Sequence, residues 1–229
     1  MKKILLLALI TLMTCTRGSG QSMFSGSTDL EVIANEWENT TLSGVTNGSL
    51  VSMLDCFNKK WPTWMLNAAI KTMKKGVDGR DAYENDRIVV RNKPKNGFVS
   101  VDWWGNAERH EFMRACYWTR PNGNRLFGIY FGGTDNDPNI HFVCFYNSDP
   151  KKHTLTPEPQ IIEGFRTTED TKYFYDLPEE GKEFRISEFG IRGHYIHTFK
   201  WDGMKPVFSQ SEKIEEEADG DHCDEEEEE

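Results

Sequence analysis

Between residues 87 and 147 the chain alternates short apolar segments with turn sequences, and this pattern limits the fold more than any other feature. Five segments rich in β-branched and aromatic residues are typical of strands: 87–91, 97–104, 110–119, 125–133 and 139–147. Their links are short and contain turn residues, above all Asn122-Gly123, so neighbouring strands are expected to run antiparallel. A later hairpin is expected over 195–208, around Asp202-Gly203.

Helices are expected before these strands. Apolar residues recur at helical spacing in three segments: 27–39, 47–58 and 61–76. The predicted fold class is α+β, with two or three N-terminal helices packed on a mainly antiparallel sheet and a further C-terminal β-hairpin region. The expected divisions are an export signal, an N-terminal segment with a short helix, an α+β body and a disordered acidic tail, over residues 1–20, 21–46, 47–208 and 209–229.

The register of the central strands follows from the turns. A two-residue turn at Asn122-Gly123 sets Cys116 opposite Ile129, and the next loop sets Cys144 near Phe127. One face then carries Phe112, Cys116, Trp118, Phe127, Ile129, Phe131, Phe142, Cys144 and Tyr146. The opposite face is also apolar, with Met113, Tyr117, Leu126, Tyr130, Val143 and Phe145. Either the early helices cover one side of the sheet, and both faces are covered core, which we favour, or an aromatic patch is left for a partner.

The first twenty residues have the three-part form of an export signal. Lys2 and Lys3 precede an apolar run over 4–13, and small residues follow over 14–20. Such a run spans about 15 Å as a helix, about half the hydrocarbon core of a bilayer, which argues against a membrane-spanning helix. We therefore expect an exported protein.

The cleavage position decides whether the exported protein is anchored or free. The stretch Leu12-Met13-Thr14-Cys15 resembles the bacterial lipobox, which implies lipidation of Cys15 and an outer-membrane lipoprotein facing the periplasm. Cleavage after Gly20 would instead give a free periplasmic or secreted protein that begins at Gln21. The lipobox is favoured, and both alternatives remain open.

The negative charge is concentrated in the C-terminal tail. Without residues 1–20 the chain has 24 basic and 37 acidic residues, a net charge of −13. Residues 212–229 hold twelve acids and one lysine, so −11 of that charge lies there. Such a run is expected to be solvated and disordered, and its Asp219, Asp221 and Asp224 lack the spacing of a calcium-binding EF-hand. No basic stripe remains to bind nucleic acid.

Residues with catalytic or metal-binding chemistry do not form a known motif. The chain lacks G-x-S-x-G, H-E-x-x-H and P-loop sequences, so no cofactor or metal is expected. His194 and His197 are three residues apart on an expected strand and therefore point to opposite faces. Export permits disulfides, but Cys116 and Cys144 lie two strands apart and should not bond to each other. Cys56 either forms a disulfide with one of them or stays a free thiol.

Two resemblances to known proteins add to this interpretation. Residues 174–208 contain Leu177-Pro178, Gly181-Lys182 and Lys200-Trp201-Asp202-Gly203. This segment resembles the C-terminal part of exported proteins of unknown function common in Bacteroidetes, which implies a structural turn signature. The order of two helices and four strands over 47–146 is similar to the helix–helix–four-strand unit of β-lactamase-inhibitor-like proteins. That similarity implies binding through a concave sheet and transfers no inhibitor residue.

The leading functional hypothesis is a non-enzymatic protein of the cell envelope that binds a protein or glycan through aromatic sheet surface. Aromatic rings give large contact area at modest entropic cost, and the expected binding residues are Trp103, Trp104, Tyr117 and Tyr130. The alternative is a secreted hydrolase with a site at the 132–141 loop, formed by Asp135, Asp137 and His141.

Overall fold

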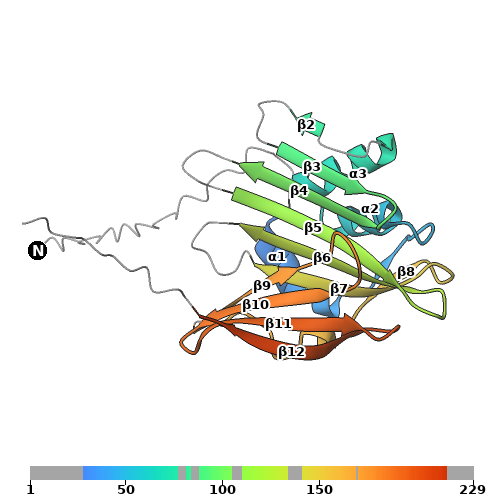
Figure 1. Ribbon diagram of the computed structural model, residues 1–229. Coiled ribbons are helices and arrows are strands. Elements are labelled where there is room, and N and C mark those ends of the chain that lie inside the picture. The colour runs from blue at the N-terminus through green and yellow to red at the C-terminus, as the bar shows by residue number, and fades with distance from the viewer. Residues whose placement is uncertain are drawn as a thin grey trace, which may run out of the picture.

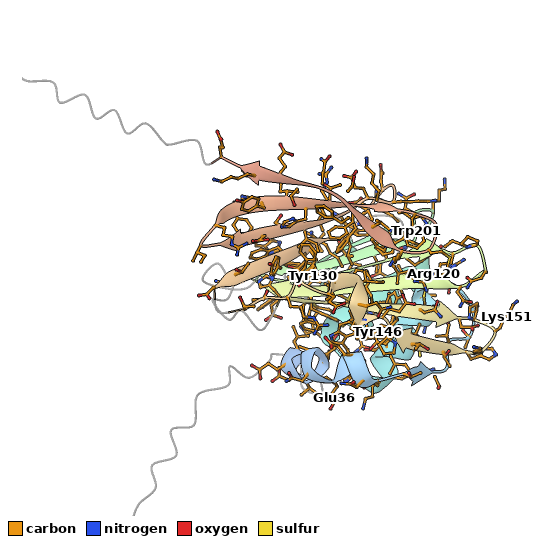
Figure 2. The ribbon with its side chains drawn as sticks, turned by 90° about the horizontal axis from the view of Figure 1, so that it is seen from below. Glu36, Arg120, Tyr130, Tyr146, Lys151 and Trp201 are labelled. Atoms are coloured by element: carbon orange, nitrogen blue, oxygen red, sulfur yellow. The ribbon has the colours of Figure 1, made fainter. Side chains whose placement is uncertain are left out.

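The chain folds into three layers: helices, a larger β-sheet and a smaller C-terminal sheet. The structure is a computed structural model, and it describes residues 28–76, 81–83, 88–104, 110–133, 141–168 and 170–215. Figure 1 shows the helices behind the larger sheet and β9–β12 in front of it, and Figure 2 shows the same layers from below. The expected α+β class, with helices packed on a mainly antiparallel sheet, is confirmed. The expected export signal with Cys15, and the tail beyond 215, lie outside the described residues.

The helices are short, and their side chains form the first layer of the core. They are α1 (Leu30–Glu36), η1 (Trp37–Asn39), α2 (Leu50–Lys60) and α3 (Trp64–Lys75). Thr63 caps α3 by accepting a hydrogen bond from the Leu66 amide at 3.1 Å. The ring of Phe57 in α2 lies 6.0–6.4 Å from those of Phe127, Phe131 and Tyr146, which fixes α2 on the larger sheet. Within the described residues, no helix has the length and apolar character needed to cross a membrane.

All described strand pairs are antiparallel. The larger sheet has the order β1-β8-β7-β6-β5-β4-β3-β2. Its strands are β1 (Leu42–Ser43), β2 (Asp81–Tyr83), β3 (Ile88–Lys93), β4 (Phe98–Trp104), β5 (His110–Thr119), β6 (Arg125–Gly133), β7 (Phe142–Asp149) and β8 (Thr154–Pro157). After a 3-10 turn, η3 (Pro159–Ile162), the C-terminal sheet follows in the order β12-β11-β10-β9. Its strands are β9 (Thr171–Asp176), β10 (Phe184–Gly190), β11 (Gly193–Trp201) and β12 (Pro206–Ile214).

The predicted register between β5 and β6 is wrong by one residue. The Arg120 amide donates to the Asn124 carbonyl at 2.9 Å, so the loop holds three residues instead of two. Gly123 closes it with a φ of +84°, as in a turn followed by a glycine bulge. Cys116 therefore lies opposite Gly128 and not Ile129. Because a shift of one residue reverses every side chain, three residues lie on the face opposite to the predicted one: Phe112, Cys116 and Trp118.

The predicted face is otherwise correct on the next strand pair. Ile129 lies opposite Cys144, two residues away from the predicted pairing, and a shift of two preserves the face. Six of the predicted residues therefore share the side that the helices cover: Phe127, Ile129, Phe131, Phe142, Cys144 and Tyr146. The other side of β5–β7 is covered by the C-terminal sheet, so it is covered core, as favoured from the sequence, and not an open aromatic patch.

A buried ion pair joins the two sheets. Arg120, at the end of β5, is 7% exposed and donates two hydrogen bonds to the Glu158 carboxylate, at 2.8 and 2.6 Å. It also donates to the Asn147 side chain at 2.6 Å and to the Met204 carbonyl at 2.8 Å. Met204 belongs to the expected hairpin at Asp202-Gly203, which connects β11 and β12. The guanidinium group thus fixes this hairpin to the larger sheet, and Figure 2 labels Arg120 at that junction.

The described cysteines are buried free thiols. Cys116 lies on the side of the C-terminal sheet, whereas Cys144 faces the helices, and they are not bonded to each other. Cys56 in α2 donates its thiol hydrogen to the Ser43 carbonyl at 3.4 Å. Burial raises the pKa of all three thiols, most strongly for Cys116 and Cys144.

Candidate binding groove

A groove lies where the C-terminal sheet ends over the larger sheet. The ring contacts between the sheets come from β5, β6 and β7: Trp118 with Trp201, Tyr130 with Tyr175, and Phe145 with Phe184. Beside these contacts is a cavity of about 550 Å³. Its floor is formed by β3, β4 and β5, including Arg91, Ser100, Asp102, Trp104 and Arg114. Its wall is the segment from Asp176 to Arg185. We call this cavity the Trp104 groove.

The wall is fixed at both ends and in its middle. Leu177 is buried under the sheet interface. The Asn96 side chain donates to the Glu179 carbonyl at 3.1 Å, and the Trp118 indole donates to the Lys182 carbonyl at 3.3 Å. Gly181, with a φ of +77°, allows the chain to turn between these contacts. The Leu177-Pro178 and Gly181-Lys182 motif noted in the sequence therefore builds one side of the groove.

An exposed tryptophan stands on the groove floor. Trp104 is 54% exposed, and its ring stacks on that of His110 at a centroid distance of 3.8 Å with 6° between the planes. His110 Nε2 lies 3.3 Å from Asp102 Oδ1, and Ser100 donates its hydroxyl to the other oxygen of Asp102 at 3.4 Å. Because His110 supports one face of the indole, the other face is a rigid apolar platform next to a carboxylate.

Charged groups of both signs follow the rest of the groove. Arg114, on the floor, lies 3.9 Å from Asp176 on the wall, and Arg91 lies 3.9 Å from Glu179. Lys93 approaches Glu179 more closely, at 3.3 Å. These pairs are partly exposed and contribute little to stability. They do supply hydrogen-bond donors and acceptors at close spacing, which a polar ligand can use.

Three of the four expected binding residues lie elsewhere. Trp103 points to the helix side, where its ring lies 6.3 Å from that of Trp64. Tyr117 is on that side too, half-buried, with the Arg125 guanidinium 4.2 Å from its ring. Tyr130 is 1% exposed between the two sheets. The four residues therefore do not share one surface, and Trp104 alone is in the groove.

The loop of the alternative hydrolase is only partly described. Asp135 and Asp137 lie outside the described residues, so that hypothesis stays a prediction. His141 borders a second cavity, of about 460 Å³, together with Trp37 and Tyr175. The hydroxyl of Tyr130 lies 2.9 Å from His141 Nδ1. Burial lowers the pKa of His141, which favours the neutral ring.

Metal-binding arrangements can be judged over the described part of the chain. His194 and His197 point to opposite faces of β11, as expected for positions three apart on a strand. Among the described residues no group of three or more His, Cys, Asp or Glu side chains is placed to hold a metal ion.

Sequence reasoning missed the partners of Trp104. Ser100, Asp102 and Trp104 occupy every second position of β4 and alternate with the apolar Val99, Val101 and Trp103. This alternation was visible in the sequence and marks a polar face. His110 was not predictable as a partner, because its contact depends on the β4–β5 register.

Comparison with known proteins gives no match: no family model matches the chain, and no curated protein or solved structure is significantly similar to it.

Proposed function

We propose that this protein is an exported component of the cell envelope that binds a glycan in the Trp104 groove. The observation that carries the proposal is the exposed indole of Trp104, stacked on His110 and adjacent to Asp102. A sugar ring has an apolar face of C–H groups that stacks on an aromatic platform, and a rim of hydroxyl groups that needs donors and acceptors. The groove offers both within one cavity.

The polarity of the groove favours a glycan over a protein partner. Protein interfaces centre on several aromatic or arginine anchors in desolvated pockets, surrounded by weaker contacts. Here a single exposed indole is followed by paired charges, among them Arg114 with Asp176 and Arg91 with Glu179. Hydroxyl groups can bridge such pairs without breaking them, whereas an apolar protein surface would leave them without water. Binding of a protein partner is therefore the alternative that the experiment below tests.

Calorimetric titration with a panel of soluble oligosaccharides tests the glycan proposal. We expect binding to the wild-type protein and a loss of at least about fivefold in affinity for Trp104→Ala, since stacking on one aromatic ring contributes about 1 kcal/mol or more. The matched control is Phe208→Ala, another exposed ring (51%), on β12. The proposal fails if both variants bind equally well, or if envelope proteins bind and no glycan does.

The form in which the protein is exported is part of the same proposal. We infer lipidation at Cys15, with release of a free protein beginning at Gln21 as the alternative. An intact mass of the mature protein distinguishes them. A diacyl or triacyl mass starting at Cys15 supports an anchored protein, and a mass starting near Gln21 contradicts it.

A further inference from the structure

Three polar side chains on adjacent strands of the C-terminal sheet form a hydrogen-bonded chain. Ser211 Oγ on β12 lies 2.6 Å from His197 Nδ1 on β11. His197 Nε2 lies 2.8 Å from Glu188 Oε2 on β10. From this geometry we propose a second, independent site, in which Ser211 is the nucleophile of a hydrolase that cleaves small carboxylic esters.

The register of the strands produces this arrangement. Ser211 is the direct cross-strand partner of His197, and Glu188 is opposite Tyr195, two residues from His197 along β11. All three therefore lie on the face of the sheet that also carries the buried Phe184. Nucleophile, base and orienting acid stand in the order that activates a serine hydroxyl.

The base is buried, the acid is partly buried and the serine is exposed. His197 is 8% exposed, and the ring of Phe165 packs edge-on against it at a centroid distance of 5.0 Å. The pairing of β9 with β10 sets Tyr173 opposite Glu188. Ser211, on the edge strand β12, is exposed. The imidazole is thus held from two sides while the hydroxyl that it contacts stays accessible to a substrate.

Proton transfer in this geometry is balanced without any further group. The Ser211 oxygen attacks the ester carbonyl carbon as its proton passes to His197 Nδ1, and Glu188 stabilises the imidazolium through Nε2–H. Collapse of the tetrahedral intermediate breaks the ester C–O bond, and the leaving alkoxide takes the proton from Nδ1. Water then attacks the acyl-serine by the same route, releasing the acid and restoring Ser211.

The position of β12 leaves one backbone donor for the developing oxyanion. β12 is the last strand of the C-terminal sheet, and alternate amides of an edge strand point away from their partner strand. Of the consecutive amides of Ser211 and Glu212, one therefore points to the open edge. Phe165 limits the space over the imidazole, so small acyl groups such as acetyl fit this site better than long ones.

Labelling of the full-length protein with a fluorophosphonate, mapped by peptide mass spectrometry, tests the proposal. We expect the probe on Ser211, together with hydrolysis of p-nitrophenyl acetate. His197→Gln should slow both by about 100-fold or more, in the range of general base catalysis. Ser211→Ala should abolish the labelling, and Ser209→Ala, an exposed serine on the same strand, should leave it unchanged.

Outcomes that overturn the proposal are equally specific. If the folded wild-type protein carries no probe on Ser211, the three residues serve only to satisfy a buried histidine. Equal rates of ester hydrolysis in wild type and Ser211→Ala, with both folded by circular dichroism, would lead to the same conclusion. The mapping on the wild type does not depend on whether any variant folds.

Discussion

Replacing Arg120 by methionine should strongly lower the free energy of unfolding, because Arg120 joins the two sheets. The substitution keeps an unbranched apolar stem but removes the guanidinium group that contacts Glu158, Asn147 and Met204. Asn147 retains a hydrogen bond from the Asn124 amide group at 3.3 Å, whereas the Glu158 carboxylate loses both of its bonds from Arg120. The main cost is therefore a poorly solvated carboxylate without its cation.

The magnitude follows from the burial of the pair. Removing one partner of a buried ion pair costs about 3–5 kcal/mol. The Glu158 side chain is 19% exposed, so water reaches it partly, and we expect a value near the lower end, about 3 kcal/mol. For a domain of this size each kcal/mol lowers Tm by about 2–4 °C, so Tm should fall by about 6–12 °C.

Urea unfolding followed by tryptophan fluorescence measures this loss. The double variant Arg120→Met/Glu158→Gln should be less destabilised than the sum of the single variants by more than about 1 kcal/mol, because it leaves no unpaired charge. Arg166→Met is the control, since Arg166 pairs with Glu38 at 2.7 Å in an exposed position and should cost at most about 1 kcal/mol. Equal losses for Arg120→Met and Arg166→Met would refute the reasoning.

Three further predictions concern thiols, turns and pH. The thiols of Cys56, Cys116 and Cys144 should resist a thiol-specific reagent in the folded protein and react in concentrated guanidinium, because burial raises their pKa and blocks access. Rapid labelling of Cys116 or Cys144 in the folded state would be inconsistent with their burial. Gly97→Ala should lower the free energy of unfolding by about 2 kcal/mol, and Gly181→Ala by about 1 kcal/mol. Both positions have positive φ, but only a Cβ added at Gly97 would clash with the Tyr117 ring. Equal losses in chemical unfolding would contradict this. Burial lowers the pKa of His141, so the unfolded chain binds a proton that the folded chain does not, and the free energy of unfolding should fall as pH drops below the ordinary value of 6.5. The urea midpoint of His141→Gln should fall less than that of the wild type below this pH. Equal decreases in the two midpoints would contradict the role of His141.

The sequence predicts the strands better than their register. The expected segments 97–104, 110–119 and 125–133 coincide with β4, β5 and β6 to within one residue, because alternation of apolar side chains is a strong local signal. The turn at Asn122-Gly123 was located correctly but assigned the wrong length. A two-residue turn would place Pro121 in the strand, where it has no N–H to donate, and the three-residue loop avoids this. Pro121 was visible in the sequence, but nothing in the sequence showed that it would outweigh the preference of Asn-Gly for a two-residue turn.

The C-terminal sheet was only half foreseen. The hairpin of β11 and β12 was expected from Asp202-Gly203, but β9 and β10 were not, and their pairing creates four strands. The Trp104 groove depends on that sheet, since Leu177 and the Trp118 hydrogen bond to Lys182 hold its wall. Such contacts join residues about sixty positions apart, and no local pattern specifies them. The exposed Trp104 was predicted as a binding residue, whereas its role as part of a groove required the three-dimensional arrangement.

A two-dimensional ¹H–¹⁵N spectrum of the indole N–H groups tests the central claim most directly. The chain has seven tryptophans, and their indole signals can be assigned by single substitutions. On addition of a bound oligosaccharide, the signal of Trp104 should move with the largest amplitude, while that of the buried Trp61 stays in place. If the Trp104 signal does not respond to any glycan that binds the protein, the Trp104 groove is not the binding site.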